Sequence, residues 1–186
     1  MLYKLENLLY VYRELVKRGV KAVIIGDTVV QIALGYKKLE GDLDLFVLEP
    51  SPIMERDFYE NIAHELEWET SLTEIGTPAL IIPLVEGHLV VELYENYMDI
   101  EIPSEILESA DEMRINSEKI VLIKPEHYLV LKARQGVDIS KLKKYISELK
   151  SRGILNKKLV ENTLSLYPEE EQELIVERLG EAGLKL

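Results

Sequence analysis

The segment GDLDLFV, residues 41–47, constrains the fold most, because it places two aspartates two positions apart in a run typical of a buried strand. Side chains at positions i and i+2 of a strand point to one face, so Asp42 and Asp44 converge while Leu43 and Leu45 point into a core. Two ionised carboxylates held close together repel each other unless a cation lies between them. Carboxylate oxygens suit Mg²⁺, which also binds substrate phosphates. The segment therefore predicts a strand that carries a divalent metal site on one face.

A third carboxylate stands in another apolar run, HLVVELYE, where Glu92 is flanked by valine and leucine. A pair of metal ions that activates an attacking oxygen and stabilises a leaving pyrophosphate usually takes a ligand from a neighbouring strand. We therefore expect Glu92 to share the metal with Asp42 and Asp44. The alternative is that Glu92 faces solvent from a sheet with alternating sides.

The segment VIIGDT, residues 23–28, predicts a strand that enters a helix through a glycine. Amides at a helix N-terminus hold anions, and Gly26 lets a phosphate approach the backbone. Asp27 also suits a plain helix cap, a role compatible with phosphate binding. Lys132, on an otherwise apolar helical run, is either a phosphate contact or a surface lysine whose stem lies along apolar neighbours.

The periodicity of apolar residues predicts a mixed sheet flanked by helices. Helical spacing covers residues 2–18, 27–36 and 53–66, and four further helices follow Pro125. Strand patterns cover residues 21–26, 41–49, 79–85 and 88–95, with another candidate at 67–75 and a hairpin at 113–123. Crossover and hairpin connections alternate, so we expect an α/β (α+β) fold with a core at residues 1–125 and a C-terminal helical region at 126–186 packed on it.

The composition narrows the class of protein. The chain has 186 residues and no cysteine, which excludes disulfides and thiolate metal sites. Its net charge of −12 makes it a poor non-specific binder of nucleic acid. No apolar run approaches the ~18 residues that span a membrane, so we expect a soluble cytoplasmic protein without membrane contact. Abundant Glu and Lys and the lack of Cys favour a thermophile.

The run VIIGDTVVQIALGYKKLEGDLDLFV, residues 23–47, resembles the signature of the DNA-polymerase-β-type nucleotidyltransferase superfamily. That signature is a strand, a Gly-Gly or Gly-Ser pair at a helix start, Asp-x-Asp on the next strand, and a third acid later, which Glu92 matches. The form of GDLDLFV and the segment VLIKPEHYLVLKA are similar to the minimal and abortive-infection (AbiEii-like) nucleotidyltransferases. The resemblance covers roughly residues 20–135.

This resemblance implies transfer of a nucleoside monophosphate from an NTP, expected to be ATP, with Mg²⁺ or Mn²⁺, to a protein or RNA acceptor. It also implies a toxin–antitoxin setting, in which the partner is a small helical toxin or antitoxin protein or a tRNA. The catalytic and metal-binding residues would be Asp42, Asp44 and Glu92, with Glu92 as general base towards the acceptor hydroxyl. The residues expected to bind the nucleotide are Gly26, Asp27, Thr28, Lys38 and Lys132.

The sequence departs from this signature at Asp27, which stands where the second Gly or Ser is found, and at Glu40, which precedes the Gly-Asp pair in place of Thr or Ser. An acid beside a triphosphate is repulsive. A second hypothesis is therefore a catalytically degenerate protein that acts as a binding or neutralising partner, since an acidic surface suits a basic protein. Phosphohydrolase chemistry at the same metals is a third.

Overall fold

A mixed seven-stranded β-sheet forms the centre of the core in the computed structural model, which describes residues 2–98 and 100–186. Its strand order is β5-β6-β7-β4-β2-β9-β8. The pairs β4/β7 and β2/β9 are parallel and the others are antiparallel. The strands are β2 (Lys21–Ile24), β4 (Leu43–Glu49), β5 (Glu69–Leu72), β6 (Pro78–Pro83), β7 (His88–Tyr94), β8 (Asp111–Ile115) and β9 (Glu118–Leu122). The predicted α+β architecture with a mixed sheet is confirmed.

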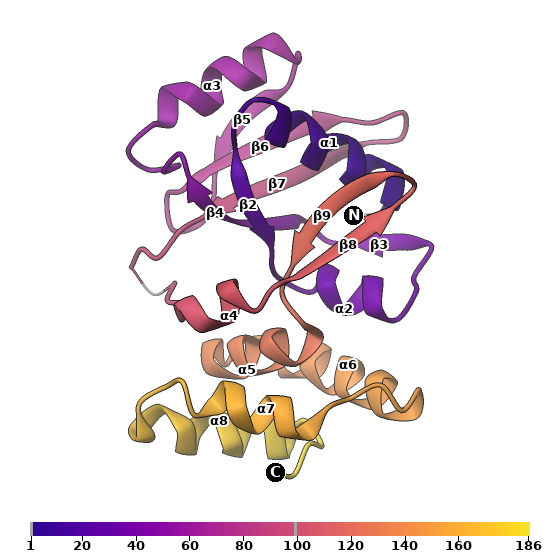
Figure 1. Cartoon of the computed structure of the whole chain (residues 1–186), viewed down its shortest axis with the longest axis vertical. Coiled ribbons are helices and arrows are strands. Elements are labelled where there is room, and N and C mark those ends of the chain that lie inside the picture. The colour runs from indigo at the N-terminus through magenta and orange to yellow at the C-terminus, as the bar shows by residue number, and fades with distance from the viewer. Residues whose placement is uncertain (1, 99) are drawn as a thin grey trace.

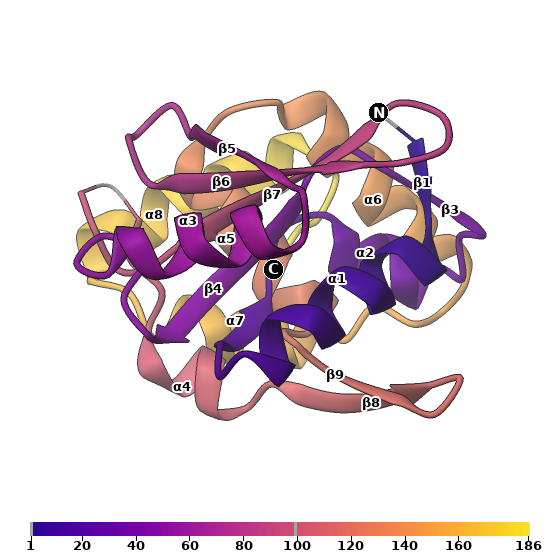
Figure 2. The ribbon, with the colours of Figure 1, turned by 90° about the horizontal axis from the view of Figure 1, so that it is seen from above.

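Helices α1 (Leu5–Lys17) and α3 (Arg56–Glu65) cover one face of this sheet (Figures 1 and 2). The apolar positions of α1 recur at helical spacing, so one side of the helix is buried against the strands. Tyr12 fastens this helix to two of them, because its hydroxyl donates to Ala22 O at 2.7 Å and accepts from Val121 N at 3.2 Å.

The C-terminal helices lie on the opposite side of the sheet from α1 and α3 (Figure 1). They are α5 (Pro125–Gln135), α6 (Ile139–Ser151), α7 (Lys157–Leu164) and α8 (Glu169–Glu181), as the sequence predicted. Helix α5 is the central one, since it contacts α2 (Thr28–Ala33), α6, α7 and α8. It thereby joins the helical layer to the sheet core.

Three short elements differ from the predictions. Strands β1 (Leu2–Lys4) and β3 (Lys38–Glu40) form a separate antiparallel pair, where the sequence predicted a helix from residue 2 and no strand at 38–40. Burial of Tyr3 and Leu39 favours this pair over another helical turn. Helix α4 (Ser104–Glu108) was not predicted, because five residues give too little periodicity. Within the described residues, none of the helices has the length and apolar character needed to cross a membrane.

Candidate active site

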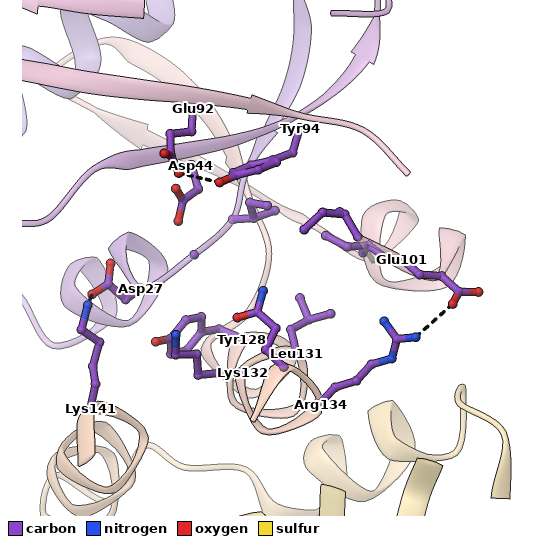
Figure 3. A pocket seen from close by; sticks show the side chains of 15 residues that line it. Asp27, Asp44, Glu92, Tyr94, Glu101, Tyr128, Leu131, Lys132, Arg134 and Lys141 are labelled. Atoms are coloured by element: carbon purple, nitrogen blue, oxygen red, sulfur yellow. Dashed lines mark hydrogen bonds and ion pairs between the residues drawn. The ribbon is translucent and has the colours of Figure 1, made fainter. Parts of the chain in front are cut away.

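Two of the predicted acids meet because strands β4 and β7 are parallel neighbours. Asp44 lies directly opposite Glu92 in the register, and both are flanked by buried residues such as Leu45 and Leu93. Side chains at matching positions of adjacent strands lie on one face of the sheet. Figure 3 shows both carboxylates directed into a cavity of about 230 Å³. The structure thus brings Asp44 and Glu92 together, as the sequence predicted.

Further acids surround this pair, and burial and their charges act on Asp44. Burial raises the pKa of Asp44 well above its usual range, and the charges of Glu92, Asp27 and Asp42 raise it further. The Tyr94 hydroxyl donates to Glu92 Oε2 at 2.5 Å. Burial and this hydrogen bond raise the pKa of Tyr94, which keeps its proton available to Glu92. No ion pair within residues 2–98 and 100–186 involves Asp44 or Glu92. Two facing carboxylates without a cation have the donor chemistry that suits Mg²⁺ or Mn²⁺.

Asp42 is placed differently from the other two acids. It precedes the first residue of β4, is exposed, and lines a second, more open cavity of about 770 Å³. We call the first cavity the inner cavity and this second one the outer cavity. Glu92 and Tyr94 line both, so Asp42 lies on the outer side of Glu92. In the part of the chain that the structure describes, no three His, Asp or Glu side chains are gathered closely enough to hold a metal. The three-acid metal site stays a prediction, built on the Asp44 and Glu92 pair.

Gly26 makes room for the Asp44 carboxylate. It has φ +70°, and a Cβ at this position would lie 1.9 Å from Asp44 Oδ2. The neighbouring backbone is also joined, because Ile25 N donates to Asp44 O at 2.9 Å. A glycine is required here both for the left-handed conformation and for the close approach. Gly26 lines the inner cavity, so the turn after β2 and the acid on β4 form one wall.

Asp27 is buried, and its side chain does not cap α2 although it occupies the N-cap position. Its Oδ2 accepts a hydrogen bond from the Tyr145 hydroxyl at 2.9 Å and pairs with Lys141 Nζ at 3.0 Å, both from α6. The side-chain cap that the sequence suggested is therefore not formed. The acid that departs from the family signature faces a cation of the C-terminal helices.

Of the other predicted nucleotide-binding residues, Lys132 lines the inner cavity, whereas Thr28 and Lys38 do not. Lys132 lies on α5 and lines the inner cavity, as Figure 3 shows. Thr28 is fully buried and its hydroxyl is 3.0 Å from that of Tyr3, so it lies behind the cavity wall. Lys38 is exposed on β3, opposite Lys4, and lines neither cavity.

The sequence did not identify Lys141 and Arg134, which line the inner cavity from α6 and α5. Arg134 also lines the outer cavity, and it pairs with Glu101 at 3.1 Å and Glu171 at 2.5 Å. Lys141 occurs in a polar helical segment typical of a solvated face, and Arg134 stands near the end of the helical run that also holds Lys132. Only the packing of the helices against the sheet places them at a cavity, and no local motif signals that placement.

Comparisons with known proteins agree with this fold. A family model described as "Nucleotidyl transferase of unknown function (DUF2204)" matches residues 4–181. No curated protein sequence matches the chain. An antigenic nucleotidyltransferase-like protein from Paracoccidioides brasiliensis has a similar structure, with a TM-score of 0.59 and 14% identity over 98% of this chain and 91% of that one. ANT(2")-Ia in complex with adenylyl-2"-tobramycin has a TM-score of 0.52 and 15% identity over 94% and 98%.

At these identities the two solved structures show a shared fold and nothing finer. The family match agrees with the resemblance to nucleotidyltransferases in the sequence. It does not extend to the narrower AbiEii-like group that the sequence suggested.

Proposed function

The chain belongs to the DUF2204 family of nucleotidyl transferases, and from this premise we propose that it transfers a nucleoside monophosphate from a nucleoside triphosphate to an acceptor hydroxyl. The observation that carries the proposal is the register of β4 and β7, which sets Asp44 against Glu92 on one wall of a cavity. Lys132 stands on another wall of the same cavity. A nucleotide with bound metal needs both, since the acids attract the metal and the cation attracts the phosphates.

Asp44 and Glu92 are the residues that would hold Mg²⁺ or Mn²⁺, with Asp42 as the third ligand from the outer cavity. The bound ion would activate the attacking oxygen and stabilise the leaving pyrophosphate. Glu92 borders both cavities, so it can accept the proton of an acceptor hydroxyl that enters from the outer one. The Tyr94 hydroxyl, bonded to Glu92 Oε2 at 2.5 Å, holds that carboxylate in place.

The nucleotide would occupy the inner cavity, with its phosphates near Lys132 and the backbone at Gly26. Tyr128 and Leu131 add apolar surface to the same cavity, which suits a base or ribose. ATP is the first nucleotide to test.

The outer cavity bears on the acceptor, because four of its lining residues are acids. They are Asp42, Glu74, Glu92 and Glu171, and Arg134, which pairs with Glu171, is the one lysine or arginine that lines this cavity with them among the described residues. An RNA acceptor would bring phosphates against these carboxylates, so the charge favours a basic protein segment or a cationic small molecule with a hydroxyl over tRNA. ANT(2")-Ia, which shares the fold, was solved in complex with adenylyl-2"-tobramycin, so aminoglycosides belong among the small molecules to test as acceptors. A toxin or antitoxin partner would be such a basic protein.

The test is transfer of label from α-labelled ATP to a panel of acceptors, namely basic peptides, aminoglycosides and tRNA, with Mg²⁺ or Mn²⁺. Asp44→Asn should abolish transfer with little change in folding. Asp57→Asn is the matched control, because Asp57 is exposed on α3 and lines neither cavity. Wild-type protein that neither binds ATP nor labels any acceptor would overturn the proposal.

A non-catalytic binding partner is the second candidate, and Asp27 is the residue that favoured it. The pairing of Asp27 with Lys141 at 3.0 Å offsets the repulsion that the sequence suggested. Calorimetry separates the two functions, since a degenerate protein would release no heat with Mg²⁺-ATP at millimolar concentration. Release of inorganic phosphate from ATP without labelled product would instead indicate a phosphohydrolase.

A further inference from the structure

A buried acid in the turn after β2 meets two side chains of the C-terminal helices. Asp27 is 8% exposed, and its Oδ2 lies 2.9 Å from the Tyr145 hydroxyl and 3.0 Å from Lys141 Nζ. Lys141 and Tyr145 are four residues apart on α6, so they project from one face of that helix. Figure 3 shows Lys141 reaching from α6 to Asp27 at the edge of the inner cavity. The contact joins the sheet core to the helical layer beside the site.

The Lys141 ammonium keeps its charge and has donors to spare. Burial alone would lower the pKa of Lys141, but the hydrogen bond and charge of Asp27 outweigh it and raise the pKa above its ordinary value. An ammonium has three N–H donors. Within residues 2–98 and 100–186 its one ion-pair partner is Asp27. The remaining donors can therefore serve a ligand in the cavity that Lys141 lines.

The two lysines and the facing acid pair occupy different walls of that cavity. Asp44 and Glu92 come from the sheet, whereas Lys132 and Lys141 come from α5 and α6 (Figure 3). A triphosphate with its metal fits such a separation, since the metal binds the acids and the phosphate oxygens bind the lysines.

We propose that Lys141 binds the phosphate groups of the nucleoside triphosphate, and that Asp27 and Tyr145 are positioning residues that hold its ammonium at the cavity wall. The inference rests on the proposed function, because it names a ligand of the same nucleotide site. It explains why an acid is tolerated there, since the Asp27 and Lys141 pair adds no net charge beside the phosphates. It also makes α6 a part of the nucleotide site.

The first experiment measures binding of two probes by calorimetry, Mg²⁺-ATP and tripolyphosphate with EDTA, so that one readout needs no metal. Lys141→Ala should weaken the binding of both by about tenfold or more, as expected for a lost charge-assisted hydrogen bond. Lys143→Ala is the matched control, because Lys143 is an exposed lysine of the same helix that lines neither cavity. It should bind both probes as the wild type does.

Lys141→Ala leaves Asp27 as a buried charge without its cation, which is strongly destabilising. The double variant Asp27→Asn/Lys141→Ala removes both charges and protects the fold. It should still bind tripolyphosphate more weakly than the wild type, but less weakly than the single variant does, because the repulsion between Asp27 and the phosphates is gone.

The positioning role is tested by a double-mutant cycle. Tyr145→Phe removes one hydroxyl of a residue that lines neither cavity, and it should weaken binding of tripolyphosphate severalfold only when Lys141 is present. A merely structural tyrosine would change the melting temperature without changing the affinity in either background.

Three outcomes are decisive. Loss of affinity in both Lys141 variants, with Lys143→Ala unchanged, supports the inference. Equal affinities of Lys141→Ala and Lys143→Ala, in a wild type that binds ATP and transfers label, overturn the inference and leave the proposed function standing. Absence of ATP binding and label transfer, with Lys141-dependent binding of tripolyphosphate retained, overturns the proposed function and keeps Lys141 as an anion-binding residue.

Discussion

Gly26 lets the Asp44 carboxylate lie against the turn between β2 and α2, and its replacement by alanine tests whether this contact builds the site. The new Cβ would lie 1.9 Å from Asp44 Oδ2 and 3.0 Å from Asp44 Cβ, so rotation of the side chain alone does not relieve the clash. The carboxylate oxygen must retreat from 1.9 Å to at least 3.4 Å from the new Cβ to reach an ordinary contact. Asp44 would then no longer face Glu92 in its present geometry.

Gly26→Ala should lower the unfolding free energy for two reasons. A non-glycine residue in the left-handed conformation costs ~1–2 kcal/mol, and overpacking of a well-packed site adds ~1–3 kcal/mol. Gly35→Ala is the matched control, since Gly35 has φ +68° beside +70° for Gly26 and a Cβ added to it would meet no neighbouring atom within 4 Å. Gly35→Ala should show only the cost of the left-handed conformation. The difference between the two variants therefore measures the contact with Asp44.

Urea unfolding and label transfer from α-labelled ATP are the two assays. Gly35→Ala should lose ~1–2 kcal/mol of unfolding free energy and keep wild-type transfer per folded molecule. Gly26→Ala should lose more, and its transfer rate should fall ~100-fold, because displacement of a catalytic group by ~1 Å has an effect of that size. If Gly26→Ala were as stable and as active as Gly35→Ala, the argument that Gly26 exists to accommodate Asp44 would be refuted.

Three further predictions concern the scaffold and the inner cavity. Burial, with a smaller contribution from the charge of Lys124, lowers the pKa of His127 to about 4. Above about pH 6.5 the imidazole is therefore neutral in the folded and the unfolded protein. The unfolding free energy should fall as the pH drops from about 6.5 to 4, by up to ~3 kcal/mol, because the unfolded protein takes up the proton first. Urea unfolding at a series of pH values checks this, and His127→Gln should flatten that part of the curve. Tyr12→Phe removes the hydroxyl that joins α1 to β2 and β9, so it should cost ~1–3 kcal/mol in the same assay, and a loss near zero would contradict the role given to that hydroxyl. In the full chain, Lys132→Ala removes the cation that α5 places at the inner cavity, so calorimetry should detect weaker binding of tripolyphosphate, whereas wild-type affinity would show that Lys132 has no part in the site.

The pair of Asp44 and Glu92 was predictable from the sequence, because each acid stands within a short apolar segment whose pattern predicts a strand. Asp44 and Glu92 each interrupt an apolar run, and both runs proved to be strands, β4 and β7. The alternation of hairpins and crossovers also indicated a mixed sheet. The rule for positions i and i+2 applies less well to Asp42, because β4 begins at Leu43 and the chain before it is not held in the sheet.

The cationic wall was not predictable, because its members are far apart in sequence and carry no motif. Lys141 lies more than a hundred residues after Asp27, and their contact depends on how α6 packs against the core. Lys38 was expected to bind the nucleotide. Pairing of β3 with β1 sets it opposite Lys4 instead, outside both cavities.

The boundary that the sequence suggested near residue 125 separates two regions of chain but not two independent sites. Asp27 is buried in the core and depends on Lys141 and Tyr145 of α6 for its charge and hydrogen-bond partners. An uncompensated buried carboxylate is costly, so the core is stabilised by the helical layer at the place where the acids converge. The same contact carries a cation to the cavity. Asp27 departs from the family signature and so cast doubt on the nucleotide site. Its contact with Lys141 is therefore a physical reason to include the helical layer in the proposed nucleotide site.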